Sequence, residues 1–165
     1  MAQEETVRQK YRDLTLLLID KGITISTMES CTSGQIASLI TDTEGSSAVF
    51  RGSYVTYSNS EKIRLGVPAE VIERHGVYSE QTASEMARLC RRDFRTDLGV
   101  GISGTFGNTD PNNSDSVPGE VFFAISTANE TRSFHCTIPV QKTRPDYKLY
   151  MADVVADRIR EALGR

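Results

Sequence analysis

The chain has 165 residues, 38% hydrophobic and 25% charged, which is the composition of an ordinary globular domain with its own core. Its formal net charge of −3 and its lack of a sustained Lys/Arg run argue against a nucleic-acid or anionic-membrane partner, which needs a positive patch. Because no apolar window approaches about eighteen residues and the N-terminus is charged where a signal peptide is apolar, we expect a cytoplasmic protein with one domain over residues 1–165.

The first third of the chain predicts helices that alternate with strands. Apolar residues recur at helical spacing over residues 4–21, which indicates a first helix. Residues 23–27 alternate apolar and hydroxyl side chains like a strand, and helical spacing resumes over 34–40. The aromatic and β-branched residues of 48–58 predict a second strand, with Gly52 at a bulge.

Three helices are predicted next, each from its first residues. Ser58 or Asn59 can cap a short helix, and Pro68 can begin another. Ser79 is suited to cap a longer, amphipathic helix over residues 80–94.

The remaining pattern predicts three strands and a last helix. A short apolar run at 97–103 indicates a strand buried on both faces. It leads into a loop at 104–119 that is dense in Gly, Asn, Asp and Pro, and loops of this length usually have a task. Residues 120–127 and 131–138 predict a hairpin, and residues 146–163 predict a final helix.

These elements together favour an α/β fold class: a three-layer α/β/α single domain with a mixed, mostly parallel sheet. In such sheets ligands gather where strands end and helices begin. We therefore expect the loops at 28–34 and 103–119 to line one cleft. Open strand edges at the hairpin favour a homodimer.

The strand-to-helix junction around Ser30 allows two interpretations. A hydroxyl of Ser30, Thr32 or Ser33 can cap the helix that follows. Alternatively, Ser30 is a nucleophile, and the free N–H groups of the turn beside Glu29 form an oxyanion hole or a phosphate cradle. The residues by themselves leave both interpretations open.

A nucleophilic serine needs a base. His75 at a helix end and His135 in an edge-like strand are poorly placed, which disfavours a Ser-His-Asp triad. Lys62 follows Tyr57 by five residues, and both can point into the predicted cleft. A lysine acts as a base only when neutral, which requires burial or a nearby positive charge. The alternative is a surface lysine paired with a glutamate.

Other candidates carry weaker signals. Cys31 is a rival nucleophile, but no histidine is positioned beside it, so we interpret it as a small buried hydrophobe. Three cysteines without CxxC spacing fit neither a disulfide scaffold nor a zinc site. The loop at 104–119 lacks the glutamate and glycine of a calcium loop, so no metal and no cofactor are predicted. Arg144 and Lys148 either hold an anion at the last helix or are simply solvated.

Several segments are recognisable together by their order and spacing, and Arg144 continues the pattern towards the C-terminus. They are ESCTSG (29–34), TDTEGSS (41–47), FRGSYVTYSNSEK (50–62), LGV (65–67), HGVYSEQTASEMA (75–87), GISGTFG (101–107) and VPGEVFFAI (117–125). These segments resemble the family of the CinA C-terminal domain, the stand-alone nicotinamide-nucleotide amidohydrolases often called PncC. The resemblance covers nearly the whole chain.

The resemblance implies hydrolysis of the carboxamide of nicotinamide mononucleotide, giving nicotinic acid mononucleotide and ammonia in pyridine-nucleotide salvage. It implies Ser30 as the nucleophile, with Lys62 taking its proton directly or through Tyr57. The partner is then a small-molecule nucleotide substrate. The substrate-binding residues expected on this basis are Glu29, Cys31, Thr32, Ser33, Gly34, Ser103, Gly104, Thr105 and Arg144.

Two positions depart from the family pattern. Ser33 stands where the family usually has a second glycine, and Phe106 with several Asn and Asp residues replaces part of the family's glycine-rich loop. The alternatives are therefore a family member that binds a nucleotide with altered or lost catalysis, and an interaction module, because the family domain also occurs fused to another domain.

Overall fold

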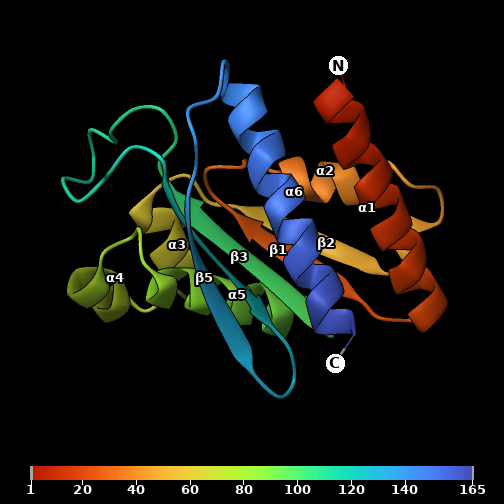
Figure 1. Cartoon of the computed structure of the whole chain (residues 1–165). Helices are drawn as coiled ribbons and strands as arrows, with labels where there is room; N and C mark the ends of the chain where they lie inside the picture. Colours follow the sequence, from red (N-terminus) through yellow and green to blue (C-terminus); the bar gives the residue numbers. More distant parts are fainter. Residues whose placement is uncertain (1, 165) are drawn as a thin grey trace.

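A five-stranded sheet in the order β2-β1-β3-β4-β5 forms the centre of the computed structural model, which describes residues 2–164 (Figure 1). The parallel neighbours are β2 (Phe50–Val55), β1 (Ile25–Glu29) and β3 (Leu98–Gly104). β4 (Glu120–Ser126) is antiparallel to both β3 and β5 (Thr131–Thr137). Four of these five strands therefore run in one direction, which confirms the predicted mixed, mostly parallel sheet.

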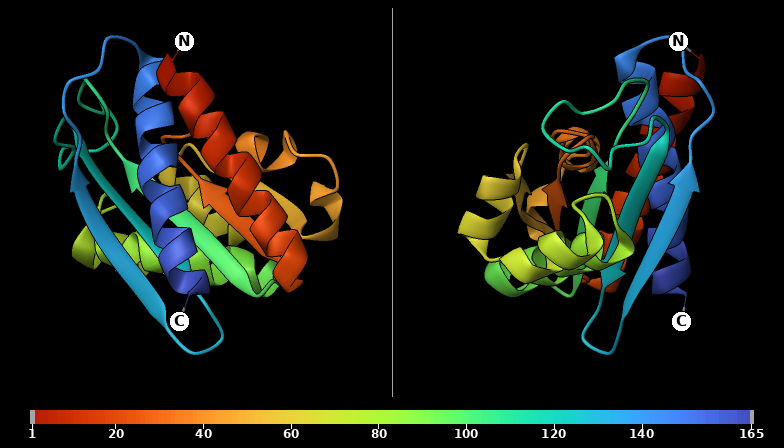
Figure 2. Two further views of the ribbon diagram at one scale, coloured as in Figure 1. Left: turned by 45° about the vertical axis from the view of Figure 1, so that its right-hand side comes forward. Right: turned by 90° about the vertical axis from the view of Figure 1, so that its left-hand side faces the viewer.

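Helices cover both faces of the sheet, as predicted for three layers. Figure 2 shows α1 and α6 side by side on one face and α5 on the other. The larger apolar core lies under α1, α2 and α6, and a second one lies under α5. None of the helices in residues 2–164 combines the length and apolar character needed to cross a membrane. The helices are α1 (Ala2–Lys21), α2 (Gln35–Thr41), η1 (Ser46–Ala48), α3 (Asn59–Leu65), α4 (Ala69–His75), α5 (Glu80–Phe94) and α6 (Arg144–Leu163).

Local signals located several helix starts correctly. Ser58 and Ser79 cap α3 and α5, each accepting a hydrogen bond from a backbone N–H three residues on. The last helix begins two residues earlier than expected, because Thr143 at its N-cap and Asp146 in its first turn form a capping box. This earlier start places Arg144 in the first turn of α6.

The prediction for β1 was displaced by two residues. Residues 23–27 were expected as the strand because they alternate, but every side chain of β1 is buried. β1 lies between β2 and β3 and is covered on both faces, so the alternation typical of a one-sided strand does not apply to it. The strand consequently extends to Glu29 and carries this carboxylate to the carboxyl end of the sheet.

Glycines of β3 allow α5 to lie directly against the sheet. A Cβ on Gly101 would be 2.3 Å from the Ala83 carbonyl oxygen and 2.5 Å from the Ala87 nitrogen, and Gly99 is equally close to α5. The bulge predicted at Gly52 is also present, because the register with β1 shifts there and a Cβ would meet the Phe94 ring. Side-chain volume on these strands therefore limits how closely the layers pack.

Replacing Gly101 by alanine is expected to lower the free energy of unfolding by about 1–3 kcal/mol or more, because α5 must move to admit the methyl group. Urea denaturation measures this loss. Gly164→Ala is the control, since a Cβ there meets nothing nearer than 3.8 Å. Equal losses in both variants would contradict the close approach of α5 to β3.

Candidate active site

The turn after β1 is capped by a carboxylate. Gly34 occupies the N-cap position of α2 with φ 88° and provides no side-chain cap. The two oxygens of Glu29 instead accept hydrogen bonds from the backbone N–H groups of Ile36 and Ala37, both at 3.0 Å. The interpretation that a hydroxyl of this turn caps α2 is therefore wrong. The Ser30 hydroxyl is consequently not used by the helix.

The carboxylate of Glu29 holds the turn in place through hydrogen bonds. Its side chain is fully buried and also accepts hydrogen bonds from the hydroxyls of Thr32 at 2.7 Å and Thr27 at 3.0 Å. With four donors around it, the carboxylate connects the end of β1 to the first turn of α2. Glu29 and Thr32, both expected to bind substrate, thus lie behind the turn that presents Ser30.

Lys62 contacts the Ser30 hydroxyl directly. Its Nζ lies 3.3 Å from Ser30 Oγ and 3.1 Å from the Thr56 carbonyl oxygen, and only 2% of the residue is exposed. Burial lowers the pKa of Lys62 to about 8, although interactions with Cys31 and Asp110 oppose this shift. The surface interpretation of Lys62 is therefore wrong, and the neutral amine that a base requires is available under mildly alkaline conditions.

Cys31 is not a competing nucleophile. It is buried in the larger core, and burial, reinforced by the charge of Glu29, raises the pKa of its thiol to about 12. A thiol with so high a pKa carries almost no thiolate at neutral pH. The interpretation of Cys31 as a small buried hydrophobe is confirmed.

A cavity of about 240 Å³ opens beside Ser30. The two predicted loops meet there, one contributing the serine turn and the other the segment after β3. Ser103 does not reach the cavity, because it is buried and its hydroxyl donates to the Val77 carbonyl oxygen. Ser33 and Gly34 form the turn without lining the cavity. The expected site residues that do line it are Ser30, Cys31, Tyr57, Gly104, Thr105 and Arg144.

Arg144 lies at the mouth of this cavity. Its guanidinium donates to the Tyr57 hydroxyl at 2.9 Å and to Asn108 Oδ1 at 3.3 Å, and it lies 5.5 Å from the centre of the Phe106 ring. Phe106 is buried and stacks on Tyr147 of α6, which fixes the ring beneath the guanidinium. The guanidinium of Arg144 is thus fixed in position by its neighbours. Its hydrogen-bond partner Tyr57 is 62% exposed.

Sequence reasoning missed five polar residues of the cavity wall: Tyr78, Asn108, Thr109, Asp110 and Asn112. Tyr78 precedes the cap of α5 and donates its hydroxyl to Asp110 Oδ2 at 2.5 Å. The signal for the other four was the length and polarity of the loop at 104–119. This signal indicated a task for the loop but not which of its side chains would face the serine.

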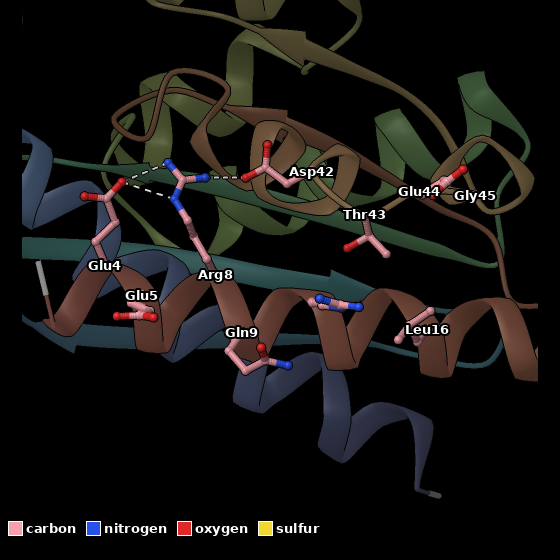
Figure 3. Close-up of a pocket in the computed structure, with 10 residues that line it drawn as sticks. Glu4, Glu5, Arg8, Gln9, Leu16, Asp42, Thr43, Glu44 and Gly45 are labelled. Carbon is pink, nitrogen blue, oxygen red and sulfur yellow. Dashed lines mark hydrogen bonds and ion pairs between the residues drawn. The ribbon is translucent and has the colours of Figure 1, made fainter.

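A larger hollow of about 980 Å³ lies between α1 and the segment after α2. Figure 3 shows Arg8 there between Glu4 and Asp42, to which it is paired. This hollow is open to solvent, and none of its lining residues is a nucleophile beside a buried base. The smaller cavity at Ser30 is therefore the candidate active site.

The fold and this site define a class: three-layer α/β domains with a serine–lysine pair at the carboxyl end of parallel strands. The family model of the CinA C-terminal domain matches residues 7–163. The chain belongs to the CinA C-terminal domain family, as its resemblance to that family indicated.

Individual relatives agree with this membership. The chain is 34% identical over 158 residues to a CinA-like protein of Gemmatimonas aurantiaca, covering 93% of this chain and 36% of that protein. It is 37% identical over 154 residues to a CinA-like protein of Chloroherpeton thalassium, with 90% and 36% covered. The chain thus spans about a third of the length of the curated relatives it matches.

Solved structures show the same fold over the whole domain. The crystal structure of a competence or damage-inducible protein from Enterobacter asburiae is similar with a TM-score of 0.86 and 27% sequence identity. The similarity covers 95% of this chain and 98% of that one.

Replacing Glu29 by glutamine is expected to lower the free energy of unfolding by about 2–4 kcal/mol. An amide group cannot accept from all four donors, so at least one buried donor loses its partner. Urea denaturation of the variant measures the loss, and Glu44→Gln, an exposed carboxylate near the end of α2, should stay within about 0.5 kcal/mol of the parent. A Glu29 variant as stable as the Glu44 variant would contradict the capping role.

Lys62 is expected to make stability depend on pH. Folding lowers the pKa of its amine from 10.5 to about 8, so the unfolded chain binds more protons between these values. The stability contributed at Lys62 is therefore lowest below about pH 8 and recovers as the pH rises towards 10.5.

The variant Lys62→Met removes this dependence. Its stability relative to the parent should be more favourable at pH 7 than at pH 10 by about 2 kcal/mol. Urea denaturation of both proteins at the two pH values measures the change. A difference that stays constant with pH would contradict a lowered pKa of Lys62.

Proposed function

We propose that this domain hydrolyses the carboxamide of nicotinamide mononucleotide to nicotinic acid mononucleotide and ammonia. The observation that carries the proposal is the buried amine of Lys62, 3.3 Å from Ser30 Oγ and with a pKa of about 8. The substrate follows from the resemblance to the nicotinamide-nucleotide amidohydrolases, and membership of the CinA C-terminal domain family supports it.

The reaction begins with proton transfer between these two residues. Neutral Lys62 takes the Ser30 proton as Oγ attacks the carboxamide carbon, and the carbonyl oxygen becomes an oxyanion. When this intermediate collapses, the C–N bond breaks and Lys62 returns the proton to nitrogen, which leaves as ammonia. Water then attacks the ester, again giving a proton to Lys62, and the acid leaves as Ser30 regains its hydrogen.

The oxyanion is proposed to meet backbone N–H groups of the serine turn. The N–H of Ser33 already donates to the Ser30 carbonyl oxygen at 2.9 Å, so Ser33 is set aside. The remaining candidates are the N–H groups of Cys31, Thr32 and Gly34. Each such donor typically lowers the activation free energy by about 3 kcal/mol.

Arg144 is proposed to bind the substrate phosphate. Tyr57 and Asn108 hold its guanidinium at the cavity, and a planar cation of this kind suits phosphate oxygens. Because the Tyr57 hydroxyl is bound to Arg144, we propose that Lys62 deprotonates Ser30 directly. Tyr57 then positions the phosphate-binding cation.

Activity is expected to depend on both members of the pair and on pH. Ser30→Ala and Lys62→Met should each lower ammonia release from nicotinamide mononucleotide at least about 10³-fold, because nucleophile or base is lost. The parent rate should rise up to about pH 8 and level off above it, since Lys62 must be neutral. A coupled ammonia assay with chelator present measures these rates.

Glu61→Gln is the matched control, because Glu61 is the exposed neighbour of Lys62 in α3. Its activity should remain within about twofold of the parent. A parent protein that binds the nucleotide without releasing ammonia would support the alternative of a binding domain. A pH-independent rate would contradict Lys62 as the base.

A further inference from the structure

We propose that Asp110 is a specificity-determining residue, whose carboxylate binds the positively charged pyridinium ring of the substrate while Arg144 takes the phosphate. This inference rests on the proposed function, and it adds a recognition group that neither the family resemblance nor the sequence pattern supplied.

The carboxylate is fixed on the cavity wall before any ligand arrives. Oδ2 of Asp110 accepts hydrogen bonds from the Tyr78 hydroxyl at 2.5 Å and from Asn113 Nδ2 at 2.6 Å. Oδ1 accepts the backbone N–H of Asn112 at 2.8 Å, and Asn59 of α3 in turn holds Asn113 at 2.8 Å. A group held in this way loses little conformational freedom when it binds a ligand.

Among the described residues, no cationic side chain is paired with this carboxylate. None of the ion pairs within residues 2–164 includes Asp110. Although partial burial opposes it, hydrogen bonds from Tyr78 and Asn113 lower the pKa of Asp110, so the group is ionised at neutral pH. An ionised carboxylate facing a small cavity attracts a cation into it.

Asp110 lines the same cavity of about 240 Å³ as Ser30. Burial lowers the pKa of Lys62 and the charge of Asp110 opposes this shift, so the two groups interact electrostatically. Lys62 is itself in contact with Ser30 Oγ, where the carboxamide must lie. The ring that carries this carboxamide therefore lies within the field of Asp110.

The two fixed charges of the cavity match those of the substrate. Nicotinamide mononucleotide carries a cationic ring and an anionic phosphate, and the cavity presents one carboxylate and one guanidinium. In the product, the new ring carboxylate offsets the charge of the pyridinium. Asp110 is therefore expected to favour the substrate over the product and so to assist product release.

The test compares ligands that differ in ring charge. Dissociation constants are measured by calorimetry at pH 8 in the Ser30→Ala background, with and without Asp110→Asn. The ligands are nicotinamide mononucleotide, its reduced dihydro form with a neutral ring, and nicotinic acid mononucleotide. Asp110→Asn should raise the dissociation constant of the cationic substrate about tenfold. The dissociation constant of the neutral-ring form should stay within about twofold. The preference for substrate over product should decrease accordingly.

Asp115→Asn is the matched control. Asp115 is an exposed carboxylate of the same loop that does not line this cavity, so removing its charge should change none of the three constants by more than about twofold.

Each other outcome overturns part of the proposal. If Asp110→Asn weakens the binding of the cationic and neutral forms equally, Asp110 only orders the loop. If the dissociation constants do not change, Asp110 has no role in binding. Either result overturns the inference while the proposed hydrolysis stands. If the Ser30→Ala protein binds none of the three nucleotides and the parent releases no ammonia, the proposed function fails first.

Discussion

Burial of the Lys62 amine is the constraint on which the site depends. The amine lies between Ser30 Oγ and the Thr56 carbonyl oxygen, with 2% of the residue exposed. The same burial that lowers its pKa to about 8 makes the charged form unfavourable in the folded chain. Stability near neutral pH and basicity at this position are therefore opposed.

A second buried charge keeps the serine turn in place. Glu29 accepts hydrogen bonds from two backbone N–H groups of α2 and from two threonine hydroxyls, all within eight residues of it in the chain. Because this carboxylate serves α2 as its cap, the hydroxyl of Ser30 is left for Lys62. Of the two buried ionisable groups, Glu29 fixes the turn and Lys62 contacts the Ser30 hydroxyl.

The two departures from the family pattern are accommodated without closing the site. Ser33, which replaces a glycine, adopts φ 51° with its side chain exposed, so the added atoms point away from the core. Phe106 is buried against Tyr147 and lies beneath the guanidinium of Arg144. The altered loop therefore carries polar groups such as Asp110, while its Phe106 still lies beneath the guanidinium of Arg144.

Local sequence determined much of the scaffold. The helical periodicities and the caps Ser58 and Ser79 follow from interactions within a few residues, so they could be recognised without coordinates. The junction after β1 was also recognisable, because strand and helix patterns meet there.

Tertiary structure alone decided what the side chains at this junction do. Whether Lys62 is buried or solvated depends on its contacts with Ser30, 32 positions away, and with Thr56, and the pairing of Arg144 with Tyr57 joins residues 87 positions apart. The cap of α2 came from Glu29 rather than a hydroxyl, since a carboxylate at the end of a fully buried strand has no water to bind. Burial and charge at a site are set by residues distant in the chain, and no local pattern records them.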